Sequence, residues 1–288
     1  MMTIRGSNMK RIDNLKQVKR SRLIAAAVTA LLTLWCMWWL YDQEFHYANT
    51  DAGRLSAVED YVRRPEDSHS VVGIAHDTPV RVVSYAEHGR TLYIYYAAEN
   101  ADNVHGIVCL KKGINFKYQP VSYSQSPFPY TAGVTGQNVP NTSNKDEKLF
   151  AIAGDGCDDI SAFKLEFSVA EMYSDRAKTY EKTFEVTEPD FLWLLDRSEL
   201  EQELGIPTDA TLRFMTEEIY LLDKDGNDVT EQYRDESVRQ SWGGGGGSAE
   251  LFMLYVFIGI VAVLGLVIVR YFLTDEKQAE EKPQQDLI

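Results

Sequence analysis

The chain has 288 residues with a formal net charge of −14; 44% of its residues are hydrophobic and 25% are charged. This composition is typical of a folded protein and excludes a chain that is disordered throughout. Because Asp and Glu (43) outnumber Lys and Arg (29), the sequence also argues against an extended phosphate-binding surface, and we expect no nucleic-acid partner.

Residues 1–22 form a basic segment, and the apolar run after them, residues 23–41, predicts a first transmembrane helix. At 1.5 Å per residue a helix of this length spans roughly 28 Å, close to the hydrocarbon thickness of a bilayer. A cleaved signal peptide is the alternative, but no small-x-small site follows the run, so we predict an uncleaved signal anchor. Aromatic residues typical of a membrane interface lie at its C-terminal end: Trp35, Trp38, Trp39 and Tyr41.

Residues 251–273 form a second apolar run that is uncharged until Arg270, and they predict a second transmembrane helix. In this run Gly259, Ala262 and Gly265 place small residues on roughly one face, which permits close approach of another helix. The segment between the runs, residues 42–250, holds 19 basic and 37 acidic residues. The positive-inside rule therefore places the N-terminus and the acidic tail, residues 274–288, in the cytoplasm, and residues 42–250 outside.

Residues 42–69 form a juxtamembrane segment, in which apolar side chains at helical spacing predict a short helix over residues 54–63. Across residues 70–242 the pattern changes to short runs of alternating apolar and polar residues, typical of β-strands. We expect hairpins of residues 79–87 with 91–97, of 104–111 with 116–122, and of 219–222 with 229–233 around Asp225-Gly226. Further strands are expected at residues 148–153, 162–169, 178–186 and 211–214, with a loop at residues 124–147 and a short helical or extended element at 191–195.

These elements predict a membrane-anchored all-β protein, in which two transmembrane helices flank an extracytoplasmic antiparallel β-sandwich. A β-barrel is the alternative. Residues 243–250, which contain five consecutive glycines, predict a flexible linker between this domain and the second span.

Five aromatic residues lie within fifteen positions, running from a predicted strand into a proline-bearing loop. Exposed aromatic side chains on such a loop would stack on sugar rings or anchor a peptide, whereas the alternative is that they fill the core. The candidate ligand-binding residues are Phe116, Tyr118, Tyr123, Phe128 and Tyr130.

Asp155, Asp158 and Asp159 place three carboxylates on one short loop, which is a weak calcium candidate beside the alternative of a solvated acidic turn. No His or Cys spacing predicts another metal site, and we expect no cofactor. Cys109 and Cys157 are the cysteines outside the spans, and a disulfide between them is one expectation. The alternative is that Cys109 is a small core residue. Asn141-Thr142-Ser143 matches the N-glycosylation pattern, which matters only in a eukaryotic secretory pathway.

No catalytic motif is visible in the sequence, and we expect a protein that is not an enzyme. The layout resembles that of bi-spanning envelope proteins of Gram-positive bacteria. The leading hypothesis is a component of a cell-envelope assembly, held in the lipid bilayer, whose acidic β-rich domain binds a membrane or envelope protein or a ligand. One alternative is an extracytoplasmic sensor that signals through a membrane partner. A second is a hydrolase of envelope polymers.

Overall fold

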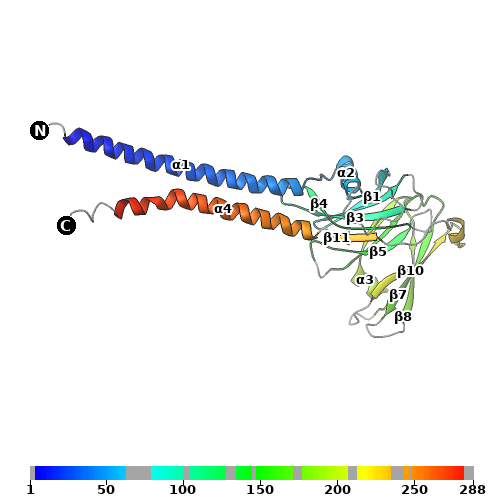
Figure 1. Cartoon of the computed structure of the whole chain (residues 1–288). Helices are drawn as coiled ribbons and strands as arrows, with labels where there is room; N and C mark the ends of the chain where they lie inside the picture. The colour runs from blue at the N-terminus through cyan, green and yellow to red at the C-terminus, as the bar shows by residue number, and fades with distance from the viewer. Residues whose placement is uncertain are drawn as a thin grey trace. The chain divides into compact units, whose positions relative to one another are not determined.

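The computed structural model describes residues 4–62, 79–99, 104–127, 134–144, 147–170, 177–206, 213–234, 243–246 and 248–281. The chain divides into two compact units. One is formed by the two long terminal helices, and the other by residues 45–247. Figure 1 labels their helices and strands.

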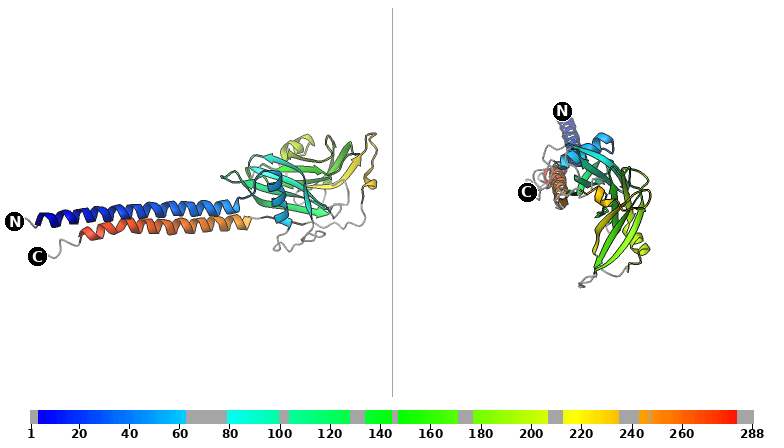
Figure 2. Two further views of the ribbon diagram at one scale, coloured as in Figure 1. Left: turned by 90° about the horizontal axis from the view of Figure 1, so that it is seen from above. Right: turned by 90° about the vertical axis from the view of Figure 1, so that its right-hand side faces the viewer.

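The terminal helices are α1 (Ile4–Glu44) and α4 (Ser248–Glu281), which lie side by side in opposite directions, so that both chain ends are at the same end of the pair (Figures 1 and 2). Within them, residues 19–44 and 251–274 are long and apolar enough to cross a membrane. A Cβ atom added at Gly265 would overlap the side chain of Thr33, whereas one added at Gly259 would meet nothing within 4 Å. Of the small residues expected to permit close approach, Gly265 is therefore at the contact with α1, and Gly259 is not.

The second unit begins with the expected short helix, α2 (Asp51–Val62), and is otherwise built from antiparallel strands. Its first sheet has the order β1-β2-β3-β4-β11. These strands are β1 (Val80–His88), β2 (Thr91–Ala98), β3 (Val104–Lys112), β4 (Tyr118–Pro127) and β11 (Gly243–Gly246). The two hairpins expected in this part of the sequence are confirmed by the register, with His88 opposite Thr91 and Lys112 opposite Tyr118.

Two three-stranded sheets complete the unit: a middle sheet of order β5-β6-β9 and a third sheet of order β10-β7-β8. The middle sheet consists of β5 (Thr135–Val139), β6 (Leu149–Gly154) and β9 (Phe191–Asp196). The third consists of β7 (Ala162–Ala170), β8 (Ala177–Glu185) and β10 (Arg213–Leu222). A short helix, α3 (Arg197–Glu203), follows β9 directly, because the Asp196 side chain accepts a hydrogen bond from the Ser198 N–H at 2.7 Å and caps it.

The three sheets and α2 pack through three hydrophobic clusters. The helix-side cluster lies between α2 and the first sheet and includes Val58 and Ile94. The inner cluster joins the first sheet to the middle sheet and includes Tyr95 and Ala151. The outer cluster joins the middle sheet to the third sheet and includes Phe150 and Phe163. The expected antiparallel packing is therefore present, but with three sheets where a sandwich has two, and the described strands form no closed barrel.

Three other expectations are wrong. The loop expected at residues 124–147 contains β5 and the last four residues of β4. The glycine run is not a flexible linker, because Gly243–Gly246 pairs with residues 122–125 of β4, whose edge offers unpaired backbone groups. After the tight turn at Asp223, the chain pairs back only through the bridge between Leu222 and Asp228 and the hydrogen bond from the Val229 N–H to the Leu221 carbonyl, and it does not continue as a strand. The Asp228 side chain accepts hydrogen bonds from the N–H and the hydroxyl of Thr230, which stabilises the short 3₁₀ helix η1 (Thr230–Gln232).

Candidate functional site

The turn between β3 and β4, residues 113–117, carries the most exposed aromatic side chain among the described residues of the domain. The Gly113 N–H donates to the Lys117 carbonyl at 2.7 Å, and the Phe116 N–H donates to the Gly113 carbonyl at 3.3 Å. The side chains of Ile114 and Phe116 are 64% and 79% exposed. We call residues 113–117 the tip.

Phe116 has a backbone φ of 62°, and among the described residues it is the one residue other than glycine with a positive φ. For an L-residue this left-handed conformation costs about 1–2 kcal/mol, because the Cβ atom approaches the following carbonyl oxygen. The fold therefore holds a large apolar side chain in water at a position where glycine would be relaxed. Such a combination points to a role other than stability.

Tyr118, two residues further along, is 1% exposed and belongs to the helix-side cluster. Its hydroxyl donates to the Glu87 carboxylate, and the Lys112 ammonium lies 5.4 Å from the centre of its ring. Burial, together with the hydrogen bond to Glu87, raises the pKa of Tyr118 above its ordinary value. Tyr118 is therefore a core residue with a satisfied hydroxyl, as the alternative interpretation of the aromatic segment held.

The structure does not describe the side chains of the three remaining candidates in that segment. Tyr123 lies in β4 opposite Val108, but its side chain lies outside the described structure, as do Phe128 and Tyr130 altogether. Of the five predicted ligand-binding residues, the structure places Phe116 on the surface and Tyr118 in the core.

The tip is joined to the segment that follows α1. The Asn115 side chain donates from Nδ2 to the Phe45 carbonyl at 2.8 Å. Tyr47 and Tyr118 exchange backbone hydrogen bonds of 3.2 and 2.8 Å, and the Tyr47 hydroxyl donates to Asp60 of α2 at 2.8 Å. The residues that connect the first span to the domain are thus paired with the beginning of β4.

A charged cluster, in which Asp155 and His105 are buried and Arg81 is partly exposed, links the first and middle sheets. Asp155, just after β6, receives hydrogen bonds from Arg81 of β1 at 2.5 and 2.7 Å and lies 2.8 Å from Nε2 of His105 in β3. The His105 ring stacks on Tyr95 of β2, with the ring centroids 5.6 Å apart. Burial disfavours the ionised form of Asp155, but the hydrogen bonds from His105 and Arg81 outweigh it and lower its pKa. Burial also raises the pKa of Tyr95 well above its ordinary value.

The candidate calcium loop is not assembled. Asp155 is directed to Arg81 and His105, whereas Asp158 and Asp159 are exposed on the following turn. No group of three or more His, Cys, Asp or Glu residues within the described ranges is arranged to hold a metal ion. Asp155, the buried one of the three carboxylates, instead binds Arg81 and His105.

The expected disulfide is also wrong, because both thiols are free. Cys109 is buried in the inner cluster and Cys157 in the outer cluster, so the middle sheet lies between them. Burial raises the pKa of Cys157 to about 12 and shifts that of Cys109 further in the same direction. Cys109 is the small core residue of the alternative interpretation.

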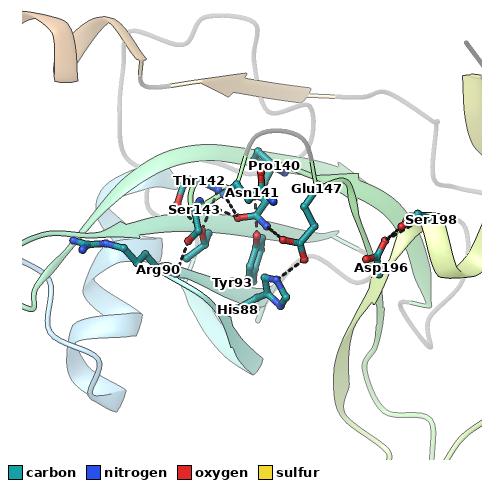
Figure 3. A network of polar contacts seen from close by, with 12 residues as sticks. His88, Arg90, Tyr93, Pro140, Asn141, Thr142, Ser143, Glu147, Asp196 and Ser198 are labelled. Atoms are coloured by element: carbon teal, nitrogen blue, oxygen red, sulfur yellow. Dashed lines mark hydrogen bonds and ion pairs between the residues drawn. The ribbon is translucent and has the colours of Figure 1, made fainter.

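A second polar network fastens the β5–β6 connection to the β1–β2 turn (Figure 3). Glu147 lies between His88, at 2.8 Å, and the side-chain amide of Asn141, at 3.0 Å. The Arg90 N–H donates to the Ser143 hydroxyl at 2.6 Å. Gly89 has a φ of 59°, and a Cβ atom there would lie 2.7 Å from Oγ of Ser143, so both the turn and the close approach require glycine.

This network includes Asn141, the acceptor residue of the N-glycosylation pattern. Asn141 is 7% exposed, and its side chain both donates to Glu147 and accepts from the N–H groups of Ser143 and Asn144. An imidazole beside a carboxylate is an arrangement that general acid–base catalysis uses. Here Glu147 binds both His88 and Asn141, and these contacts hold the β5–β6 connection in place. We therefore interpret the network as structural.

The predicted interface aromatics lie in α1, where Trp35, Trp38 and Trp39 are exposed and the rings of Trp38 and Tyr41 are 6.3 Å apart. No protein-family model matches this chain, and no curated protein or solved structure matches it either.

Sequence reasoning did not single out Ile114, Lys111 and Lys117, because it treated residues 104–111 and 116–122 as the strands of an ordinary hairpin. The available signal was that Lys111, Lys112 and Lys117 stand on both sides of the two apolar residues Ile114 and Phe116. For the cluster of Arg81, His105 and Asp155 no such signal exists, because the three residues lie on separate elements and are joined only by sheet packing.

Proposed function

We propose that this protein is a bi-spanning membrane protein that holds its β-rich domain on the extracytoplasmic side, with both termini in the cytoplasm. The observation that carries the proposal is the surface of the helix pair. Large apolar side chains are exposed along both helices, among them Leu31, Trp35, Leu264 and Leu266. A pair of helices in water would not leave so much apolar surface uncovered, whereas a bilayer covers it.

Charge supports the orientation. Seven Lys or Arg residues and one acidic residue precede residue 23, whereas residues 42–250 carry 19 basic and 37 acidic residues. A basic segment beside a span is retained in the cytoplasm. Because the helices are antiparallel, the two chain ends belong on the same side.

We further propose that the domain works by binding, as a component of a cell-envelope assembly that contacts a membrane or envelope protein. The polar groups brought together at Asp155 and Glu147 are directed at one another and hold the sheets and a loop in place. The exposed apolar side chains of the tip, in contrast, have the character of a surface that contacts something outside the domain, whether a protein or the bilayer. This division supports a role for the domain in recognition.

Orientation is tested by adding protease to intact cells, or to cells stripped of their outer layers, that express the full chain with a tag at each terminus. We expect cleavage between residues 45 and 247, with both tagged ends protected. Protection of the domain while the tags are cleaved would reverse the orientation.

The binding role is tested by cross-linking in intact membranes followed by purification through the C-terminal tag and mass spectrometry. We expect cross-links from lysines of the domain, such as Lys224 and Lys148, to one recurring envelope protein. Cross-links confined to lipid-embedded or cytoplasmic residues would contradict a binding role for the domain.

One observation favours the sensor as a second candidate. Strand β4 is paired with both segments that lead to the spans, through Tyr47 at Tyr118 and through Gly243–Gly246 at residues 122–125. A change in the first sheet would therefore act on both connections. In this case disulfide trapping between Thr33→Cys and Gly265→Cys should change in yield when the cross-linked partner is removed. An unchanged yield would argue against signalling through the helix pair.

A further inference from the structure

The tip lies at the end of the first sheet to which the segment after α1 is hydrogen-bonded. The Phe45 carbonyl, which accepts the hydrogen bond from Asn115, belongs to the residue directly after the last residue of α1. On the other side, β11 runs along β4 from Gln125 toward Ser122, so the chain moves toward Tyr118 as it approaches Ser248, where α4 begins. The first connection is thus paired with the end of β4 where the β3–β4 turn is located, and the second runs along β4 toward that end as far as Ser122.

Phe45, to which the tip is hydrogen-bonded, lies close along the chain to the apolar part of α1. The first apolar run ends at Tyr41, four residues before Phe45, and four helical residues rise about 6 Å. This is within the thickness of the headgroup layer that borders the hydrocarbon. A turn hydrogen-bonded to Phe45 is therefore close enough to meet lipid headgroups.

The side chains at the tip suit that environment. Phe116 and Ile114 are the exposed apolar residues, and the left-handed backbone at Phe116 places a ring where glycine would relax the turn. Aromatic and aliphatic side chains with basic neighbours are the composition of segments that enter the interfacial layer.

Charge distinguishes this hairpin from the rest of the acidic domain. No Asp or Glu occurs between Asp102 and Asp146, and this stretch includes Lys111, Lys112 and Lys117. The Arg90 guanidinium, from the neighbouring β1–β2 turn, donates to the Lys112 carbonyl at 2.9 Å and adds a further positive charge. Glu87 lies 3.8 Å from Lys112, and Glu44, next to Phe45, and Asp60, bonded to Tyr47, are further acidic groups at this end of the sheet. The residues of the hairpin itself are basic, which favours anionic headgroups.

We propose that the tip is a membrane-contact element, which inserts Phe116 and Ile114 into the headgroup region of an anionic bilayer, the same bilayer that the two spans cross. The proposal rests on the insertion of the spans proposed above. Its consequence is that the β-domain is held by three points, the two spans and the tip. The first sheet then keeps a fixed orientation to the membrane surface.

The test uses the full chain in lipid nanodiscs, with an environment-sensitive fluorophore on one cysteine at a time and lipids that carry quenchers at graded depths. The test variant is Cys36→Ser with Phe116→Cys. Cys109 and Cys157 are buried and do not compete for the label. The native Cys36, within the first span, reports whether the spans are inserted. Cys36→Ser with Lys224→Cys, in the exposed turn after β10, is the matched control.

We expect the probe at residue 116 to shift its emission to the blue and to be quenched at a depth of about 5–10 Å into the headgroup boundary, as interfacial apolar groups are. The probe at residue 224 should behave as it does in water. The shift at residue 116 should be larger in nanodiscs that contain phosphatidylglycerol than in phosphatidylcholine alone, and high salt should reduce this difference.

The outcomes separate the two proposals. If the probe at Cys36 is not quenched, the spans are not inserted and both proposals fail. If Cys36 is quenched while residue 116 is as exposed to water as residue 224, the membrane contact is wrong, and the tip is free for a protein. A second variant, Phe116→Gly, should unfold at the same temperature as the native chain or higher. A clear loss would show that the ring stabilises the fold and would contradict the argument from the strained backbone.

Discussion

Strands β6 and β7 are each the central strand of a three-stranded antiparallel sheet, yet they are buried differently. Every residue of β6 is buried, because Phe150 and Ile152 pack in the outer cluster while Leu149, Ala151 and Ala153 pack in the inner one. In β7 one set of side chains, including Phe163 and Leu165, is buried, and the opposite face carries partly exposed Lys164 and Glu166. The sequences differ accordingly, since β6 is apolar throughout and β7 alternates.

The comparison shows what a second packed face requires. The small side chains of Ala151 and Ala153 leave room for Tyr93 and Tyr95 of the first sheet, which lie in the same cluster. A strand that is buried on both faces does not alternate between apolar and polar residues, so its sequence does not show which layer it belongs to. The middle sheet should therefore be intolerant of substitution on either face, whereas the third sheet should tolerate it on one.

The largest effect is expected at the two buried thiols. Cys109 and Cys157 lie on opposite sides of the middle sheet, and burial raises the pKa of Cys157 to about 12, so the reactive thiolate is both hidden and disfavoured. Because both sites open only when the domain unfolds, alkylation in the folded chain should be slower than in urea by about a thousandfold or more. Mass spectrometry of the non-reduced chain measures it. A pair that stays unlabelled in urea without reductant would show a disulfide, and rapid labelling of the folded chain would show that a layer is open.

Removal of a ring from the doubly buried strand is next in size. Phe150→Ala should lower the free energy of unfolding of the domain by about 3–5 kcal/mol, because it leaves a cavity in the outer cluster. On the solvated face of β7, Glu166→Ala should change it by no more than about 0.5 kcal/mol. Denaturant titration of the full chain in detergent compares the two. Equal effects would contradict the difference between the layers.

Asp155→Asn tests the ion cluster that joins the first and middle sheets. It should lower the free energy of unfolding at pH 7 by about 3 kcal/mol, at the lower end for a broken buried pair because Arg81 is partly solvated.

The loss should depend on pH. The folded pKa of Asp155 is lowered, so its stabilising contribution is complete above the unfolded value of about 4 and is lost as the pH falls through the folded value. The difference between the native chain and the variant should therefore shrink below about pH 4. A difference that instead grows on acidification would mean that the carboxylate is not the stabilising form.

The smallest effect is expected on the exposed face of the third sheet. Lys164 of β7 and Glu181 of β8 form an ion pair of 3.2 Å, and their side chains are 30% and 54% exposed. Lys164→Gln should change the free energy of unfolding by less than about 1 kcal/mol, and the change should vanish at high salt. A larger or salt-independent loss would mean that this face is covered.

The sequence by itself determined the features that depend on local pattern. The two apolar runs have the length of a span, the alternation in residues 162–169 and 178–186 identified β7 and β8, and the helical spacing near residue 54 identified α2. In each case neighbouring residues carry the signal, because the helix and strand periods repeat within a few positions.

Only the tertiary structure decided which residues that are distant in sequence become partners. It paired the glycine run with β4, although glycine carries no side-chain pattern that favours a strand. It placed Tyr118 in the core and Phe116 at the surface, although both are aromatic and lie two positions apart. It joined Asp155 to Arg81 and His105, which lie 74 and 50 positions away. The physical reason is that these choices depend on backbone groups and faces that other strands supply, and a local pattern contains no record of which strand will supply them.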